Sequence, residues 1–348
     1  MPSCRQQRRF FHCPTRKVKP VFIVSGRPKQ KAICYEGLWE LSRRPGKTGV
    51  SPRFALRKDF ALFYQIDHLT EYCFSRPVFL EPHQLRLRPR DDGGQRLQAF
   101  KLTIDPEPVG LTNTLDAEGN NIAIAWFNGL YDHLHIRAEI EIETIRKNPF
   151  DYLLTPSNNR FPIVYQANET NALAYLRQRR SGQEHEQAVE EFAQQIQQST
   201  NGQVIPFLGR LCDAIHDQFE IIRREEGPPH APAVTLDMRR GACRDVAVLF
   251  IDACRVLGLA ARFVSGYQEG DPDQAQRDLH AWAEVYLPGT GWRGYDPTNG
   301  LAVADRHLAV AASASPELTL PIIGTFRGDN VRAQVHVNLE LESETPVN

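Results

Sequence analysis

The chain has 348 residues, which is enough for about two domains of ordinary size. Its 41 basic and 42 acidic residues nearly cancel, but residues 1–60 contain fifteen Lys and Arg against three acids, so the remainder is acidic. An acidic folded part is a poor candidate for binding a nucleic-acid backbone, which needs a basic face. No apolar run approaches the roughly 20 residues of a membrane helix, so we expect no membrane partner.

The chain contains seven cysteines, an odd number, and no Cys-x-x-Cys pair. This pattern does not indicate a disulfide framework, and a chain of this size does not need one. We therefore expect reduced thiols and a cytoplasmic location.

Residues 1–60 lack hydrophobic periodicity and are predicted to be a basic, disordered extension. Two alternatives stay open. This segment alone could contact nucleic acid, or it could lie outside the native protein. Methionine occurs only at positions 1 and 238, so a start between Val50 and Leu62 would use a non-Met codon. The intact mass of the native protein tests this hypothesis.

Short alternating segments separated by turns predict an all-β, sandwich-like domain over residues 62–147. The expected strands are 64–74, 83–88, 100–104, 122–127 and 134–145. His133 and His135 share one face of the last strand, where two imidazoles could bind a metal. With no Cys or acid pair nearby in the sequence, we predict a solvated strand face.

Residues 148–168 are rich in Pro, Asn and Tyr and are predicted to be a linker. Helical spacing of apolar residues follows at 168–180, 184–198 and 204–224. Cys212 and His216 lie four residues apart on the last of these helices. We interpret them as a buried thiol beside a partly exposed histidine rather than as a metal pair.

Cys243 is predicted to lie in the first turn of a buried helix. The sequence Arg-Arg-Gly-Ala-Cys precedes an apolar helical run that Gly258 ends. Unpaired N–H groups and the positive end of the helix dipole favour a thiolate at this position. Gly241 allows the chain to bend and approach closely, and the Cys243 amide could donate to an oxyanion.

Two other residues of this helix are expected to have no chemical role. Cys254 lies mid-helix among apolar residues and is predicted to be a packing residue. Asp245 is predicted at the exposed start of the helix, where a carboxylate stabilises the helix dipole.

Three strands are predicted after the helix, at 261–267, 280–287 and 292–295. His280 opens the second strand and Asp296 follows the third. In an antiparallel hairpin these two ends are neighbours, so the carboxylate should lie beside the imidazole and stabilise its cationic form.

These segments together resemble the transglutaminase-like superfamily, which has a papain-like cysteine fold. The motifs that carry the resemblance are Gly241-Ala-Cys-Arg-Asp245, Val264-Ser-Gly-Tyr267, His280-Ala-Trp282 and Gly294-Tyr-Asp-Pro-Thr-Asn-Gly300. The resemblance covers about residues 62–340 and is to the bacterial two-domain type, whose N-terminal β-domain contains segments such as His83-Gln-Leu-Arg-Leu-Arg-Pro89. Residues 311–321 depart from the family's usual Gly-Arg-Asp-Tyr run.

The resemblance implies an α+β chain with an N-terminal all-β, sandwich-like domain and a papain-like, transglutaminase-like catalytic domain. The predicted parts are the extension 1–60, the β-domain 62–147, the linker 148–168, the catalytic domain 169–341 and a tail 342–348. In such a domain Cys243 is the nucleophile, His280 the general base and acid, and Asp296 the residue that orients the histidine. Trp282, Tyr267 and Tyr295 are predicted to contact substrate in the cleft.

The implied reaction is acyl transfer on an amide or peptide bond of a peptide or protein substrate through a thioester. Hydrolysis, as in an amidase or protease, is the favoured version. The alternatives are a cross-linking transglutaminase with an amine acceptor and a non-catalytic scaffold of the same fold. No acidic loop with calcium-ligand spacing is present, and we expect neither a cofactor nor a metal.

Overall fold

The computed structural model describes residues 61–154, 158–179, 186–224, 227–270 and 279–344. The predictions for residues 1–60 and for 345–348 therefore lie outside the described residues. Among the described helices, none is long and apolar enough to cross a membrane.

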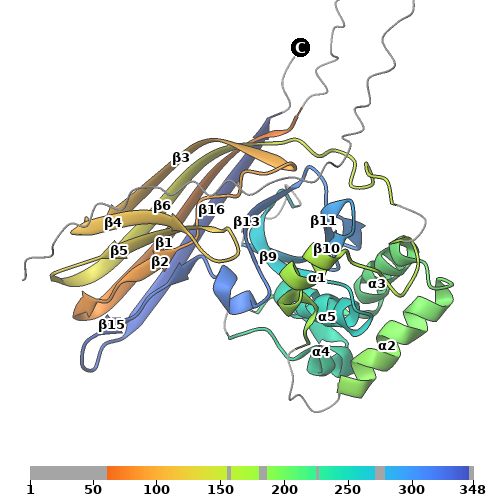
Figure 1. Cartoon of the computed structure of the whole chain (residues 1–348). Coiled ribbons are helices and arrows are strands. Elements are labelled where there is room, and N and C mark those ends of the chain that lie inside the picture. Colours follow the sequence, from red (N-terminus) through yellow and green to blue (C-terminus); the bar gives the residue numbers. More distant parts are fainter. Residues whose placement is uncertain (1–60, 155–157, 180–185, 225–226, 271–278, 345–348) are drawn as a thin grey trace, which may run out of the picture. The chain divides into compact units, whose positions relative to one another are not determined.

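Two antiparallel sheets form the strand-rich region (Figure 1). The first sheet consists of β1 (Phe63–Leu80), β3 (Gln95–Asp105), β6 (Leu130–Thr144), β15 (Phe326–Arg327) and β16 (Ala333–Glu344). The second sheet consists of β2 (His83–Leu85), β4 (Gly110–Leu115), β5 (Asn121–Trp126) and β14 (Ile322–Ile323).

The alternation of β6 explains how the two sheets share one core. Its inward-facing residues are at most 2% exposed and belong to the same apolar cluster as residues of the second sheet, such as Leu85 and Ala125. The inward-facing residues are Leu134, Ile136, Ala138, Ile140 and Ile142. The predicted sandwich-like arrangement is confirmed, although β4 was not predicted.

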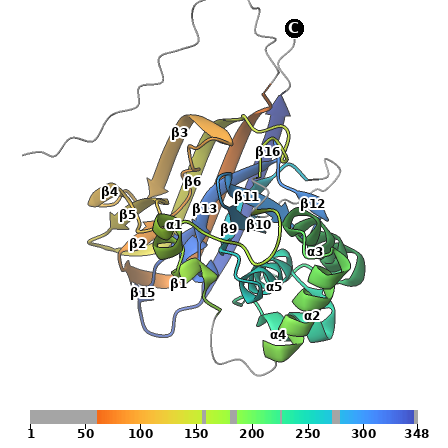
Figure 2. The same cartoon turned by 45° about the vertical axis from the view of Figure 1, so that its right-hand side comes forward.

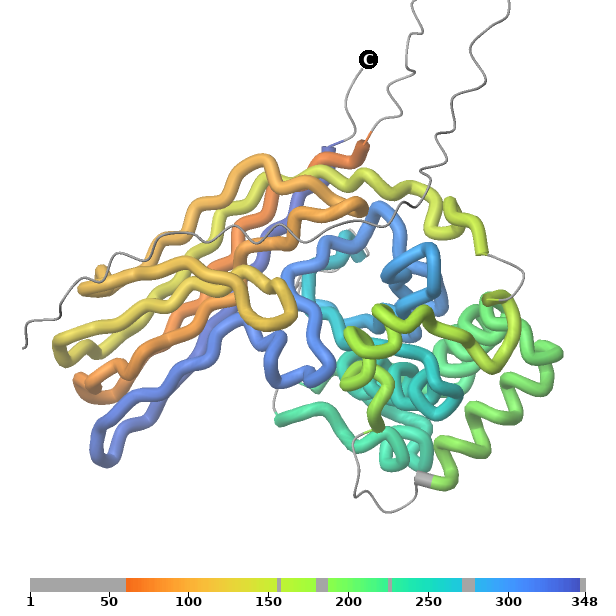
Figure 3. The backbone as a smooth tube through the Cα atoms, in the orientation of Figure 1, coloured from red at the N-terminus to blue at the C-terminus, as the bar shows by residue number. Residues whose placement is uncertain are grey.

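The C-terminal strand β16 belongs to the strand-rich region. It pairs with β1 over twelve residue pairs, from Phe63↔Glu344 to Phe74↔Ala333. Figure 3 shows this last segment running beside the first strand. Residues 333–341, which were predicted to belong to the catalytic domain, pair with the first sheet instead, because the chain returns to it after the third sheet.

A third sheet and the helices form the remainder of the described chain (Figure 2). The sheet has the order β12-β11-β10-β9-β13. Its strands are β9 (Ala261–Gln268), β10 (His280–Leu287), β11 (Gly291–Asp296), β12 (Leu301–Ala302) and β13 (His307–Ser313). The helices are α1 (Ala167–Ala172), α2 (Glu186–Ser199), α3 (Val204–Gln218), α4 (Pro232–Met238) and α5 (Cys243–Val256), with 3₁₀ turns at Tyr175–Arg177 and Pro316–Thr319.

One face of the third sheet packs against α5. The alternate β10 residues Ala281, Ala283, Val285 and Leu287 lie in the helical core together with Phe250 of α5. His280, Trp282 and Glu284 therefore face the other side, as the alternation of the sequence predicts.

The helix predicted over 204–224 ends earlier, at Gln218. The residues after it form β7 (Glu220–Ile221), which pairs in parallel with β8 (Arg240–Gly241). This long-range pairing overrides the helical preference of residues 219–224, and it ties the segment before Cys243 to the end of α3.

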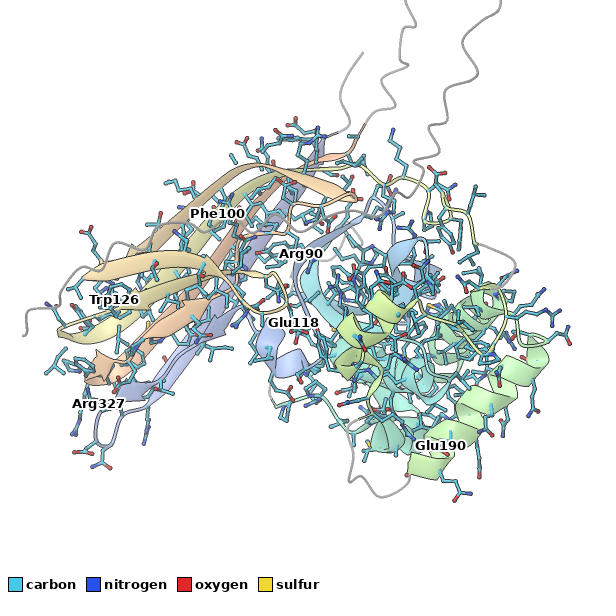
Figure 4. The ribbon with its side chains drawn as sticks, viewed as in Figure 1. Arg90, Phe100, Glu118, Trp126, Glu190 and Arg327 are labelled. Atoms are coloured by element: carbon cyan, nitrogen blue, oxygen red, sulfur yellow. The ribbon has the colours of Figure 1, made fainter. Side chains whose placement is uncertain are left out.

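Side-chain amides connect the strand-rich region to β13. Gln95 both accepts from the Ala309 N–H (2.7 Å) and donates to the Ala309 carbonyl (2.8 Å). Asn120 makes the same pair of bonds to Ala312, at 2.8 and 2.9 Å. Figure 4 labels Arg90, whose backbone N–H donates to the Ala309 carbonyl (3.0 Å). These contacts hold one edge strand of the third sheet as a neighbouring strand would.

Candidate active site

Cys243 is the first residue of α5, as the sequence predicts, and its side chain is half-buried. The preceding residue, Ala242, has an extended backbone (φ −78°, ψ 169°), and the helix begins directly after it. A Cβ at Gly241 would lie 2.8 Å from the Asp245 Cβ. Glycine is therefore required for the close approach of this loop to the first turn of the helix.

Asp245 is fully buried, which corrects the expectation of an exposed helix start. Its carboxylate accepts the N–H groups of Ala242 (2.8 Å) and His230 (2.7 Å) and pairs with Arg224 Nη2 (2.6 Å). Burial alone would raise the pKa of Asp245, but these bonds hold it below its usual value. The carboxylate thus fixes the loop that presents Cys243, in addition to stabilising the helix dipole.

His280 and Asp296 meet at adjacent ends of an antiparallel pair of strands. β10 and β11 pair with Ala283 opposite Tyr295, and His280 Nε2 lies 2.8 Å from Asp296 Oδ2. The Cys243 side chain lies close enough to the His280 ring to raise the pKa of the imidazole. Since Nε2 is directed at the carboxylate, Nδ1 is the nitrogen left for the sulfur. The structure therefore brings together the three residues that the sequence singled out.

The electrostatics of this arrangement favour a charged imidazole. Burial lowers the pKa of His280, but the Asp296 carboxylate and the contact with Cys243 outweigh it and raise the pKa to about 10. Burial would raise the pKa of Asp296, but the two histidines near it hold the pKa well below its usual range. An imidazolium next to a sulfur stabilises the thiolate form.

The turn after β11 fixes the Asp296 carboxylate. Oδ1 accepts the N–H of Thr298 (3.0 Å), and Oδ2 accepts the Asn299 side-chain amide (2.7 Å). Helix α3 holds the same turn, because the Cys212 thiol contacts the Asp296 carbonyl (3.2 Å) and His216 Nδ1 lies 2.9 Å from the Thr298 carbonyl. Cys212 is buried and His216 is exposed, as expected, and together they support the carboxylate's position.

A second histidine, His307, was not found by sequence analysis. It opens β13, is 5% exposed, and its Nε2 lies 2.9 Å from the same Asp296 oxygen that His280 approaches. Its only sequence signal is a polar residue at the start of the apolar run 307–313. That signal does not reveal a partner, because the contact requires β9 to lie between β10 and β13.

The three predicted cleft residues have different environments. Trp282 is buried beside the candidate site, with its ring stacked near His280 (6.2 Å between centroids, 29°). A Cβ at Gly266 would lie 2.7 Å from the Trp282 ring, so this glycine of β9 makes room for the indole. Tyr267 and Tyr295 do not fit a substrate-contact role, because both are buried in apolar cores. Tyr267 bonds to His68 (3.0 Å), and Tyr295 stacks on Phe250.

In the described part of the chain, two groups of side chains have ligand atoms close enough for a metal ion. The first is His280, Asp296 and His307, in which both Nε2 atoms are already directed at the carboxylate. The second is Asp105, His133 and His135 on the outer face of the first sheet. Asp105 pairs with His135 across β3 and β6, so an acid does lie near these histidines, contrary to the premise drawn from the sequence.

Two family matches cover the regions described above. Residues 64–143 match the bacterial transglutaminase-like N-terminal region, and residues 190–297 match the transglutaminase-like superfamily. The second match includes Cys243, His280 and Asp296. The chain therefore contains a transglutaminase-like domain, preceded by a strand-rich region that matches the bacterial N-terminal region of such proteins.

Individual proteins are also similar to this chain. An uncharacterized protein of Mycobacterium tuberculosis is 26% identical over 289 residues, which are 80% of this chain and 92% of that protein. A protein-glutamine gamma-glutamyltransferase of Pseudomonas aeruginosa is 38% identical over 73 residues, only 19% of this chain and 11% of that protein. A crystal structure from Cytophaga hutchinsonii, described as a candidate cysteine protease, has a TM-score of 0.62 and 20% identity. The match covers 83% of this chain and 93% of that chain, so the two proteins share a fold. The transglutaminase-like fold and these relatives support cysteine-based catalysis in general.

Proposed function

We propose that this transglutaminase-like chain hydrolyses an amide bond of a peptide or protein through a thioester on Cys243. The observation that carries the proposal is the position of His280. Its ring lies beside the Cys243 side chain, which raises the pKa of the imidazole, and its Nε2 lies 2.8 Å from Asp296 Oδ2. This is the arrangement of a nucleophile, a general base and an orienting carboxylate.

In the first half of the reaction, the Cys243 sulfur attacks the carbonyl carbon and forms a tetrahedral oxyanion. First-turn N–H groups of a helix have no intrahelical partner, so the Cys243 amide is suited to donate to this oxygen. The C–N bond then breaks as the His280 imidazolium gives its proton to the departing nitrogen. The products are a free amine and an acyl thioester.

In the second half, a water molecule attacks the thioester carbonyl while neutral His280 accepts its proton. The C–S bond breaks, the carboxylic acid leaves, and the thiolate–imidazolium pair is restored. Asp296 remains ionised throughout, because its two histidines and the turn amides stabilise the charge.

A second candidate function is transfer of the acyl group to an amine. The observation in its favour is the 38% identity over 73 residues to a protein-glutamine gamma-glutamyltransferase. The chemistry of the first half is the same in both versions. Only the acceptor differs, so the competition between water and a primary amine for the thioester decides between them.

Trapping the thioester tests the proposal. The protein is incubated with a peptide mixture, acid-quenched, and the Cys243 peptide is examined by mass spectrometry for an acyl adduct. We then expect the acid product to exceed the amine conjugate when a primary amine is added. Conjugate as the main product would favour the transferase instead.

Labelling with iodoacetamide at pH 6–7 separates an enzyme from a scaffold without a known substrate. Cys73 is exposed and serves as the internal reference, so Cys243 should react faster than Cys73 despite being less exposed. The difference should disappear in His280→Ala and persist in His135→Ala on β6. Equal labelling of both thiols in the native protein would favour a non-catalytic module.

A further inference from the structure

A cavity of about 200 Å³ is lined by residues of the third sheet and of the strand-rich region. We call it the arginine cavity. The residues that define it are Arg146, Arg262, Arg293, Trp282, Trp292 and His307. Cys243 is not among the residues lining it, so the cavity is distinct from the site of acyl transfer.

The charges around the arginine cavity do not balance. Arg262 is neutralised by Glu284 at 2.6 Å, and Asp92 lies 3.6 Å from Arg90. Among the residues that the structure describes, neither Arg146 nor Arg293 has an ion pair with a carboxylate. Burial and then repulsion by the nearby Arg146 lower the pKa of Arg293, and Tyr152, Tyr295 and Asp151 offset part of this effect. An anion between them would remove this repulsion.

Buried polar atoms beside the cavity lack partners. Trp282 is 1% exposed and His307 is 5% exposed, and both line the cavity. Trp282 Nε1 and His307 Nδ1 are buried without a hydrogen-bond partner in the described part of the chain, and so is Arg293 Nε. Buried polar atoms of this kind are almost always satisfied by protein, water or a ligand.

We propose that the arginine cavity binds a compact oxyanion, a carboxylate or phosphate group of a small molecule, through Arg146 and Arg293. The planar guanidinium group binds both kinds of oxyanion with two parallel hydrogen bonds. The indoles of Trp282 and Trp292 provide apolar walls for the remainder of the ligand. Phosphate and carboxylate ligands share this chemistry and differ in shape and charge.

His307 connects the arginine cavity to the candidate active site. Its Nε2 is 2.9 Å from Asp296 Oδ2, and its ring lines the cavity. An oxyanion that accepts a hydrogen from Nδ1 requires both ring nitrogens to carry hydrogen. The resulting imidazolium adds positive charge beside Asp296 and weakens its attraction for the His280 proton. The bound ligand is thus expected to change the reactivity of Cys243, a consequence that rests on the proposed function.

Tryptophan fluorescence of the full chain provides the test. Two of the four tryptophans line the cavity, so occupancy should change the emission. Sodium phosphate and sodium citrate are titrated separately, with sodium chloride at matched ionic strength as the blank. We expect a saturable change with at least one of the two oxyanions. The one that saturates at lower concentration identifies the source of the ligand group.

Variants assign the binding to the arginines. Arg146→Gln/Arg293→Gln should weaken binding by about 100-fold, because two charge-assisted contacts are lost. Arg332→Gln, an exposed position in the strand-rich region, is the matched control and should bind as the native chain does. If circular dichroism shows that the double variant does not fold, Arg293→Lys is used instead. It retains the charge but removes the planar fork, and should weaken binding about 10-fold.

The proposal is wrong if neither oxyanion gives a saturable change, or if the arginine variants bind as tightly as the native chain. Iodoacetamide labelling of Cys243 with and without the bound oxyanion then tests the connection through His307. Binding without any change in labelling would retain the site and reject only its effect on the thiol. The binding result therefore does not depend on whether the proposed function is correct.

Discussion

Helix α5 carries two cysteines in opposite environments. Cys243 is its first residue, is half-buried and lies beside His280. Cys254 lies eleven residues later, is fully buried in the helical core, and burial raises the pKa of its thiol well above the usual value. The same residue in the same helix is suited for nucleophilic attack at one position and only for packing at the other.

The difference lies in what surrounds each sulfur. At the start of α5, the unpaired N–H groups and the edge of the third sheet supply donors and an imidazole. In the interior, the backbone groups are paired within the helix and the neighbours are apolar. The position of a thiol relative to the helix end therefore decides its chemistry.

The largest expected effect separates the two cysteines directly. Cys243→Ala should reduce turnover of the trapped substrate by about 10⁴-fold or more, because the nucleophile is lost. Cys254→Ala should leave turnover unchanged and lower the free energy of unfolding by roughly 1 kcal/mol, the result of a small cavity. Steady-state kinetics and urea unfolding measure both. Equal activity of the two variants would contradict the comparison.

The next effect concerns the pH range in which His280 beside Cys243 is protonated. The pKa of His280 is raised to about 10, so its positive charge persists through neutral pH and is lost as pH rises through about 10. Asp296→Asn removes the main stabilising charge, and burial then lowers the pKa. The alkaline limit of kcat/KM should move from about pH 10 to below neutral, and kcat should fall by about 10²- to 10³-fold.

The same shift predicts how stability depends on pH. The folded-state pKa of His280 exceeds its ordinary value of 6.5, so its contribution is complete below about pH 6.5 and is lost as pH rises toward 10. Urea unfolding of the native chain should show this loss between pH 6.5 and 10, and Asp296→Asn should not. If the alkaline limit of kcat/KM is the same in Asp296→Asn as in the native chain, Asp296 does not control the pKa of His280.

A smaller effect is expected for the carboxylate behind the first turn. Asp245→Asn should lower the free energy of unfolding by roughly 1–3 kcal/mol, because Arg224 is left beside a neutral group and one backbone N–H loses its acceptor. Asp252→Asn, on the same helix and paired with Arg179 in a more exposed position, is the control. Asp245→Asn should lower the free energy of unfolding more than Asp252→Asn does. It should also slow the labelling of Cys243 by iodoacetamide, which Asp252→Asn should not.

The smallest effect is expected for His307. His307→Ala should reduce kcat by about 10-fold and leave KM unchanged, because Asp296 keeps its turn amides but loses one donor. His307→Gln retains a donor at this position and should recover part of the loss. The alkaline limit of the pH profile distinguishes positioning from general destabilisation, since only positioning moves it.

Local patterns predicted the parts of the site that depend on neighbours along the chain. The apolar run after Cys243 and the closing Gly258 identify α5, and the alternation of β10 identifies the face that carries His280. The two strands of the hairpin are close in sequence, so the meeting of His280 and Asp296 also followed from the pattern.

Contacts between distant segments were not predictable in this way. Asp245 looked exposed because its partners, Arg224 and His230, lie in preceding loops. The burial of Tyr267 and Tyr295 depends on which layer covers each face of the third sheet.

The sequence by itself identified the residues of the candidate cysteine site, because helix ends and hairpins are local structures with local signals. Only the tertiary structure decided that β13 lies beside β9, that His307 shares the Asp296 carboxylate, and that β16 returns to β1. These contacts join segments far apart in the chain, and apolar periodicity indicates that a strand is buried without indicating its neighbour. The position of the Cys243 thiol at a helix start therefore follows from neighbouring residues. The polar network around Asp296 and the arginine cavity depend on contacts between distant segments.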